Sequence, residues 1–283
     1  MKENKILISI LVPTYNRVKY LEECLDSIVE QEWFDLKELE LIVSDNSEWN
    51  ETKSFMNNYI KKHKDWNIKY NKNKKNLWMV WNWNKLLELK KWEYFIFLSD
   101  DDKFYDENSL NKLYVVTKKY NCDVCRWLRK EFSENGIILN EIDPDSWKLK
   151  NKSIYEYSFY EELLHHTISF WWNLYRNIDY LYEDGAKFAA DWNFNLQYLY
   201  NDKKVIIFND YTFLYRLHNS QLSRDRSAMG IKIWFQTAMF NYKFFKLPLY
   251  LRLYHIIWTC LDAIIFRVKH TFVTFINFIY DGK

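Results

Sequence analysis

Three carboxylates in a row, Asp100, Asp101 and Asp102, directly follow the apolar run YFIFLS at residues 94–99. Adjacent carboxylates repel one another unless a cation lies between them. Carboxylate oxygens are the ligands that Mg²⁺ and Mn²⁺ prefer, and such ions usually also hold the phosphates of a substrate. The pattern predicts either a divalent-cation site or a solvated acidic turn that caps the next helix, and the preceding apolar strand favours the cation.

Two more polar clusters follow apolar runs in the same way. Thr14-Tyr15-Asn16-Arg17 comes soon after ILISILV (6–12), and Asp45-Asn46-Ser47 comes after LELIVS (39–44). A tyrosine can stack on a planar ring, and the side chains of Asp and Asn can bond to the edge of a heterocycle. Asp and Asn also favour ordinary turns, so this second interpretation stays open for Asp45 and Asn46.

The elements that must position these clusters alternate along the chain. Apolar runs at 6–12, 39–44 and 94–99 are typical of strands buried on both faces, and NIKYN (67–71) is a short strand. The spacing of apolar residues predicts helices over 18–31, 51–62 and 82–91. The alternation indicates an α/β fold with a mostly parallel sheet, in which ligands bind beyond the carboxyl ends of the strands.

Composition excludes several classes of protein. The 283 residues carry a formal net charge of +2, which gives no signature of nucleic-acid binding. The apolar run at the start is too short for a signal peptide, so a buried first strand is expected there. Four scattered cysteines do not make a disulfide framework. We expect reduced, partly buried thiols and a cytoplasmic location, with a metal or redox role for Cys122-Asp-Val-Cys125 as the alternative.

The C-terminal tail has its own pattern. Apolar residues recur at helical spacing from Leu249 to Ile279, interrupted by charged residues such as Arg252 and Asp262. No stretch reaches the roughly 18 uncharged residues of a membrane-spanning helix. The pattern predicts amphipathic helices that pack on the body, form a homodimer face, or lie on a membrane surface.

The strand-end motifs together resemble those of a family 2 glycosyltransferase with the GT-A fold, a Rossmann-like nucleotide-diphospho-sugar transferase fold. The resemblance rests on ILVPTYNR, LELIVSDNS and NLWMVWNWNKLLELKKWEYFIFLSDDD, and extends more weakly to residue 225. It implies a GT-A domain at 1–227, with a nucleotide-sugar half at about 1–105 and an acceptor half at 106–227. A helical extension at 228–283 is left unexplained by it.

The resemblance also implies roles for particular residues. The donor would be a nucleotide-diphosphate sugar, most simply a UDP-sugar, and the acceptor would be a glycan or a lipid-linked saccharide. The enzyme would then be cytoplasmic or held at the inner face of the cell membrane. The residues implied to bind the nucleotide-sugar are Pro13, Thr14, Tyr15, Arg17, Asp45, Asn46, Asn76, Asn82, Asp100 and Arg216.

The chemistry implied by the resemblance is a single displacement that inverts the anomeric carbon. Asp191 would be the general base, and Asp101, with Asp102 and His218, would hold Mn²⁺ or Mg²⁺. This sequence departs from the family pattern at Asn46 and Ser99, where Asp is usual, and at Ala190, where Glu is usual. At these positions the resemblance leaves open the choice of base, the second carboxylate ligand and part of the acceptor site.

Two alternatives remain at this point. A nucleotidyltransferase also uses a parallel sheet and carboxylate-bound metal, but it predicts a glycine-rich phosphate loop where this chain has PTYNR. A degenerate GT-A module that only binds a glycan or partner is consistent with the changes at Ser99 and Ala190.

The counts of glycine and tryptophan are abnormal: 4 Gly and 14 Trp, where average usage predicts about 20 Gly. Several of the tryptophans stand where the family pattern has glycine, as in NLWMVWNWN. We therefore hypothesise that UGA codons, read here as Trp, encode Gly in the source lineage; the alternative is a Trp-rich cleft that stacks on sugars. The positions concerned are Trp33, Trp49, Trp66, Trp78, Trp81, Trp92, Trp127, Trp147, Trp171 and Trp172.

Overall fold

The computed structural model describes residues 8–32, 38–140, 146–149, 152–165, 173–185, 190–218 and 231–251, with the single positions 253 and 257. The chain divides into two compact units. The first comprises Met1–Asp184 and Asp191–Gln221, and the second comprises Gly185–Ala190 and Leu222–Lys283. The boundary expected after residue 227 lies outside the described residues.

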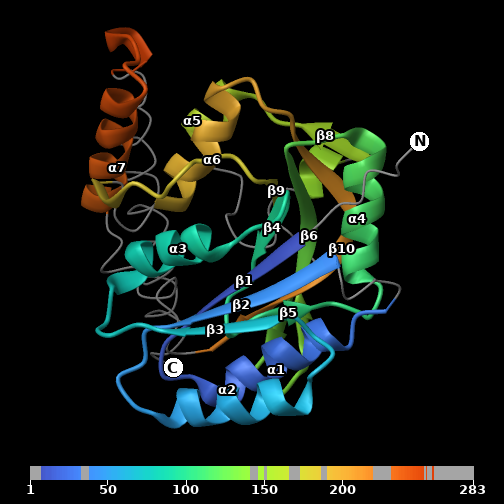
Figure 1. Cartoon of the computed structure of the whole chain (residues 1–283). Coiled ribbons are helices and arrows are strands. Elements are labelled where there is room, and N and C mark those ends of the chain that lie inside the picture. Colours follow the sequence, from blue (N-terminus) through green and yellow to red (C-terminus); the bar gives the residue numbers. More distant parts are fainter. Residues whose placement is uncertain are drawn as a thin grey trace, which may run out of the picture. The chain divides into compact units, whose positions relative to one another are not determined.

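Strands and helices alternate from β1 to β4 in the first unit, and the elements after β4 are mixed (Figure 1). The elements up to the acidic cluster are β1 (Ile8–Thr14), α1 (Val18–Val29), β2 (Leu39–Asp45), α2 (Glu51–Lys62), β3 (Ile68–Lys72), α3 (Trp78–Leu89) and β4 (Tyr94–Phe97). Those after it are β5 (Lys103–Phe104), α4 (Ser109–Tyr120), β6 (Val124–Ser133), β7 (Ile138–Asn140), a 3₁₀ helix (Ser146–Leu149), β8 (Ile154–Glu156), α5 (Phe159–His165), β9 (Asn173–Arg176), α6 (Ala190–Tyr200) and β10 (Val205–Leu217). Helix α7 (Ile231–Phe244) belongs to the second unit.

All ten described strands join one sheet in the order β3-β2-β1-β4-β9-β6-β10-β5, with β7 beside β6 and β8 beside β10. The longest ladders, β1 with β2 and β6 with β10, are parallel, as are those of β1 with β4 and β2 with β3. The short strands β5, β7, β8 and β9 pair antiparallel. The expected α/β fold with a mostly parallel sheet is confirmed.

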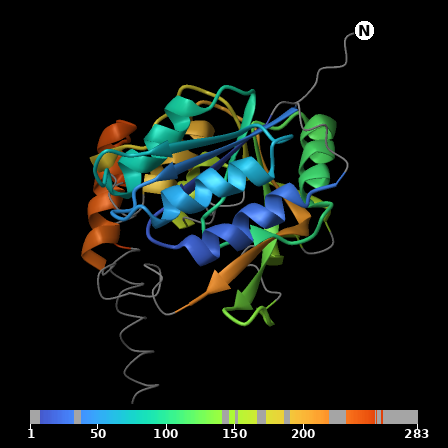
Figure 2. The same ribbon diagram turned by 60° about the horizontal axis from the view of Figure 1, so that its bottom comes forward.

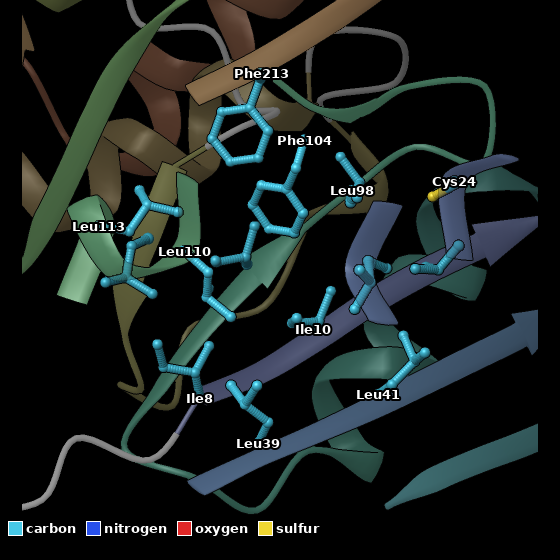
Figure 3. Packing of buried hydrophobic residues seen from close by; sticks show 14 of the residues in the cluster. Ile8, Ile10, Cys24, Leu39, Leu41, Leu98, Phe104, Leu110, Leu113 and Phe213 are labelled. Atoms are coloured by element: carbon cyan, nitrogen blue, oxygen red, sulfur yellow. The ribbon is translucent and has the colours of Figure 1, made fainter. Parts of the chain in front are cut away.

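The two faces of the sheet are covered by different helices because successive side chains of a strand point to opposite faces. Helices α1 and α2 lie side by side on one face, and α3 lies on the other (Figures 1 and 2). Alternate residues of β1 and β2, such as Ile8, Ile10, Leu39 and Leu41, pack in the core that also contains residues of α1 and α4 (Figure 3). This double coverage explains why the central strands read as continuous apolar runs.

The predicted elements of the first half agree with the structure to within about four residues. The largest difference is α3, which begins at Trp78 rather than at 82. Two side chains account for the earlier start: Oδ1 of Asn46 accepts from the backbone N–H of Leu77 at 3.2 Å, and Oδ1 of Asn76 accepts from that of Trp78 at 2.8 Å. Both satisfy N–H groups that a helix start leaves without intrahelical partners.

The expectation that the cysteines are reduced thiols is wrong for one pair. Cys122 and Cys125 form a disulfide, whereas Cys24 is a buried free thiol. Asn121, in the left-handed conformation with φ 47°, turns the chain from α4 into β6, and the two cysteine Cα atoms lie 6.1 Å apart. The cysteines therefore give no support to the cytoplasmic location that was expected from reduced thiols.

The tail is described only in part. Leu249, Leu253 and Ile257 are helical and exposed, in agreement with the helical spacing of these positions. Among the described residues, no helix is long and apolar enough to cross a membrane. The homodimer and membrane-surface interpretations of the tail stay predictions.

Candidate active site

The three consecutive aspartates lie in a tight turn that follows β4. The backbone N–H of Asp102 donates to the carbonyl of Ser99 at 3.0 Å and closes this turn. The hydroxyl of Ser99 donates to Oδ1 of Asp101 at 2.5 Å. Ser99, which replaces a carboxylate of the family pattern, therefore supports the carboxylate of Asp101 instead of adding a second negative charge.

Nitrogen atoms from two distant parts of the chain contact Oδ2 of Asp101. Nη1 of Arg17 lies 2.7 Å from this oxygen, and Nε2 of His218 lies 2.9 Å from it. Arg17 follows β1 and His218 follows β10, so the sheet brings all three groups to one edge. Arg17 is partly exposed, whereas the side chain of His218 is fully buried against the ring of Tyr20.

A carboxylate and an imidazole at one point form a donor set that suits Mn²⁺. Among the described residues, no group of three or more His, Cys, Asp or Glu side chains is placed so that it could hold a metal ion. One or two protein ligands are sufficient where phosphate oxygens and water complete the coordination. Asp101 and His218 therefore fit a divalent cation that is shared with a diphosphate.

Asp100 is buried next to Asp101 and bonds to the end of β1. The hydroxyl of Thr14 donates to Oδ2 of Asp100 at 2.7 Å, and Nη1 of Arg17 lies 3.4 Å from Oδ1. Burial, and then the charge of Asp101, raises the pKa of the Asp100 carboxyl well above its usual range. A cationic ligand at this edge would therefore stabilise the ionised form.

Asp102 and Arg216 hold the acidic turn against β10. Oδ1 of Asp102 accepts from the backbone N–H of Arg216 at 3.0 Å, and Nε of Arg216 donates to the carbonyl of Asp101 at 2.8 Å. The guanidinium of Arg216 is buried over the ring of Phe132 and pairs with Glu23 at 2.5 Å. Arg216 is thus a scaffold of the turn, and Glu23 is a partner that the sequence did not reveal.

Asp45, at the end of β2, is fully buried. Its Oδ1 accepts from the backbone N–H of Ser47 at 2.6 Å, and its Oδ2 accepts from the hydroxyl of Tyr70 at 2.6 Å and from Lys72 at 3.1 Å. Tyr70 and Lys72 both lie on β3. The two β3 residues were not singled out from the sequence, although their alternate spacing places them on one face of a strand.

Asn46 and Asn82 belong to an amide network between β2 and α3. Nδ2 of Asn73 donates to Oδ1 of both residues at 2.8 Å. The hydroxyl of Ser44 donates to Oδ1 of Asn82 at 2.7 Å, and Nδ2 of Asn46 donates to the carbonyl of Trp78 at 3.3 Å. Asn73 connects this network and was missed by sequence reasoning because single asparagines in loops are common.

The other residues that were expected to bind the nucleotide-sugar differ in their exposure and position. The ring of Tyr15 is 42% exposed, and its hydroxyl donates to Glu48 at 3.1 Å. Asn76 is exposed at the start of α3, and Pro13 lies within β1 opposite Ser44. Of these three residues, Tyr15 has the exposed ring that stacking on a base requires.

Trp78 has a backbone conformation that does not suit its side chain. Its φ is 65°, in the left-handed region that favours glycine, and its indole is 80% exposed. The indole N–H groups of Trp92 and Trp127 are buried without a hydrogen-bond acceptor among the described residues. In contrast, Trp192, which is not among the ten positions in question, donates to the carbonyl of Glu162 at 2.9 Å. The glycine hypothesis stays a prediction, and Trp78 is where it is most easily tested.

Replacing Trp78 by glycine is expected to raise the free energy of unfolding by about 1 kcal/mol, because the left-handed conformation costs an L-residue about 1–2 kcal/mol and the exposed indole loses little packing. Urea unfolding measures the change. The matched control is Trp83→Gly on the same helix, which removes a buried ring packed edge-on to Tyr182 and should lower stability by about 3–5 kcal/mol. Equal destabilisation by the two changes would contradict the argument.

Asp191 lies in the first turn of α6, in the same compact unit as the acidic turn. Its Oδ1 accepts from the backbone N–H of Trp192 at 2.9 Å. Burial raises the pKa of its carboxyl to about 6. Such a carboxylate is ionised at neutral pH yet accepts a proton more readily than an exposed aspartate. The preceding Ala190 is fully buried and brings no second carboxylate.

Comparison with protein families matches residues 9–179, more than half of the chain, to the model for glycosyl transferase family 2. An uncharacterized glycosyltransferase of Methanocaldococcus jannaschii is 27% identical over 231 residues, covering 81% of this chain and 76% of the relative. The GalNAc(5)-diNAcBac-PP-undecaprenol beta-1,3-glucosyltransferase of Campylobacter jejuni is 31% identical over 190 residues, covering 60% of each protein. This chain thus spans less than two thirds of the Campylobacter relative.

Solved structures show the same fold. The mannosyltransferase PcManGT from Pyrobaculum calidifontis, in complex with GDP-Man and Mn²⁺, superposes with a TM-score of 0.63 at 12% identity, over 96% of this chain and 81% of that one. Residues 1–349 of S. aureus TarS, in complex with UDP, give a TM-score of 0.60 at 20% identity, over 83% and 65% of the two chains. The fold is the GT-A fold expected from the strand-end motifs. The chain belongs to glycosyltransferase family 2.

Proposed function

We propose that this chain transfers a sugar from a nucleotide-diphosphate sugar, with a UDP-sugar as the first candidate, to a hydroxyl of a glycan or lipid-linked saccharide. The observation that carries the proposal is the meeting of Asp101, His218 and Arg17 at one edge of the sheet. Two of these groups suit a divalent cation, and the third suits a diphosphate. Membership of a glycosyltransferase family supports a sugar as the transferred group, rather than the nucleotidyl group that the sequence alone left open.

Asp101 and His218 would hold the cation, and Arg17 would bind phosphate oxygens of the donor. The cation, when bound, supplies charge that stabilises the leaving nucleotide. Thr14 and Asp100 position Arg17 and the acidic turn beside the end of β1. Tyr15, with its exposed ring, would stack on the base.

Asp191 would accept the proton of the acceptor hydroxyl as that oxygen attacks the anomeric carbon. The proton moves to the carboxylate, the bond from the anomeric carbon to the diphosphate breaks, and the new glycosidic bond forms on the opposite face. One displacement of this kind inverts the anomeric configuration. The raised pKa of Asp191 supports its assignment as the base.

The acceptor class is supported by one relative. The name of the Campylobacter relative states an undecaprenol-linked saccharide as its acceptor. A lipid-linked acceptor would bring the enzyme to a membrane surface. It would be consistent with a peripheral role for the exposed apolar positions of the tail.

The rate of transfer is expected to depend on the ionisation of Asp191. Because the pKa of its carboxyl is raised to about 6, the base is protonated and inactive below this pH and ionised above it. We expect kcat to rise as the pH increases through about 6 and then to reach a plateau. A profile of kcat from pH 4.5 to 8.5 at saturating Mn²⁺ measures this, and a rate that falls as the pH rises through 6 would contradict the assignment.

The proposal is tested by incubating the purified chain with Mn²⁺, a panel of nucleotide-diphosphate sugars, and glycan or lipid-linked acceptors. Mass spectrometry should detect one acceptor that gains a single hexose or related unit, and NMR should show an inverted anomeric linkage. Transfer of a nucleotidyl group, or retention of configuration, would overturn the proposal.

A further inference from the structure

Helix α6 carries Asp191 and is attached to the sheet by two tyrosine hydroxyls. The hydroxyl of Tyr175 on β9 donates to Oδ1 of Asn195 at 2.7 Å. The hydroxyl of Tyr198 on α6 donates to the carbonyl of Arg176 at 2.7 Å. Both tyrosines are fully buried, and both bonds join the same helix to the same strand.

The two bonds differ in where they hold the helix. Asn195 is four residues after Asp191, so the two side chains lie on the same face of α6, one turn apart. Tyr198 lies nearly a turn further along, in the second half of the helix. The bond from Tyr175 therefore acts on the turn that presents the base, whereas the bond from Tyr198 acts away from it.

The Tyr175 hydroxyl is itself fixed from the other side. Nδ2 of Asn173 donates to it at 2.8 Å, which leaves its own hydrogen for Asn195. The ring of Tyr175 stacks on Phe95 with centroids 5.2 Å apart and an interplanar angle of 14°. With the ring clamped and the hydroxyl bonded on both sides, the position of Asn195 is set by the sheet.

Charged groups surround this hydroxyl. Burial raises the pKa of Tyr175 well above its ordinary value; the bond from Asn173 lowers it, the carboxylates of Asp191 and Glu162 raise it, and Arg126 lowers it. These effects place Asp191 of α6, Glu162 of α5 and Arg126 of β6 within electrostatic range of the Tyr175 hydroxyl. The carbonyl of Glu162 also accepts from the indole of Trp192, the residue next to Asp191.

We propose that Tyr175 is a positioning residue for the base, acting through Asn195 to hold the first turns of α6 so that Asp191 stays partly shielded from water and correctly aimed. The proposal rests on the proposed role of Asp191 in sugar transfer. Without the hydroxyl, Asn195 loses this hydrogen bond to β9, and the first turns of α6 can move. More water then reaches Asp191, the pKa of its carboxyl returns toward the ordinary value, and the acceptor hydroxyl is less well aligned with it.

The test compares Tyr175→Phe with the matched control Tyr198→Phe. Both remove one buried hydroxyl that links β9 and α6. For Tyr175→Phe we expect the acid limb of the kcat profile to move down by about one pH unit and the plateau to fall by about tenfold, with the KM for the donor within about twofold of wild type. For Tyr198→Phe we expect an unchanged acid limb, whatever its effect on stability.

A second variant and a second readout keep the proposal falsifiable. Asn195→Leu, which removes the acceptor, should give the same shift, and the double variant should shift no further than either single one. The ionisation of Asp191 can also be followed by carbon NMR on protein labelled at aspartate, without any turnover. An unchanged acid limb in Tyr175→Phe, or equal shifts in the two tyrosine variants, would overturn the proposal. A wild-type chain without transferase activity but with the NMR shift would instead refute the proposed function alone.

Discussion

Replacing Asp191 by asparagine is expected to lower kcat for sugar transfer by about 10³-fold, because a positioned general base contributes about 10²–10⁴-fold and an amide cannot accept the proton. Asparagine has the same shape, so the hydrogen bond from the backbone N–H of Trp192 is retained. The donor should bind as in the wild type, since its phosphates are held at the acidic turn. Initial rates at saturating donor and acceptor, with calorimetric titration of the nucleotide, measure both quantities.

Asp202→Asn is the matched control for this change. Asp202 is exposed in the turn that follows α6 and has a φ of 55°, a conformation that asparagine also adopts readily. It makes the same chemical change at the other end of the same helix and should leave kcat within about twofold of wild type. If Asp191→Asn kept more than a tenth of the wild-type rate, Asp191 would not be the base.

Replacing Asp101 by asparagine is expected to abolish the metal dependence of transfer and to lower kcat/KM by about 10³-fold, since a bound cation is worth several kcal/mol of charge stabilisation. The amide removes the negative charge that attracts the cation, and it leaves Arg17 and His218 facing a neutral group. Rates measured across a Mn²⁺ titration test this. The nucleotide should bind more weakly in the same variant.

The control for the change at Asp101 is Asp65→Asn, an exposed carboxylate between α2 and β3. It alters the net charge of the chain by the same amount, so it separates the local effect from long-range electrostatics. We expect its Mn²⁺ dependence to match that of the wild type. A Mn²⁺ titration of Asp101→Asn that superposes on the wild-type curve would remove Asp101 from the metal site.

The first half of the fold was predictable because buried parallel strands leave a simple signal. Strands β1 and β2 lie between covering helices on both faces, so the apolar runs ILISILV and LELIVS are continuous in the sequence and are followed by polar clusters. The start of α3 was less predictable because it depends on the side chains of Asn46 and Asn76, and Asn46 lies about 30 positions earlier in the chain. The disulfide between Cys122 and Cys125 was missed because an isolated CxxC has several interpretations.

The site residues at strand ends were predictable from the sequence, but the hydrogen bonds and ion pairs that hold them were not. Asp101 and His218 meet as the motifs implied, since β4 and β10 carry them to the same edge of the sheet. The sequence did not reveal that Arg216 is buried against Phe132 and pairs with Glu23, or that Asp45 is saturated by Tyr70 and Lys72. Such partners come from distant segments of the chain, and their spacing in the sequence does not predict the contact.

The central claim is that the edge of the sheet around Asp101 binds a nucleotide diphosphate together with a divalent cation. Its most direct test does not need the unknown acceptor: calorimetric titration of UDP and of other nucleoside diphosphates into the wild-type chain, with Mn²⁺ and with a chelator. The account predicts that one nucleotide binds at least about tenfold more tightly with Mn²⁺ and that Asp101→Asn loses this difference. Binding that is equal with and without the cation, or no binding of any nucleoside diphosphate, would contradict it.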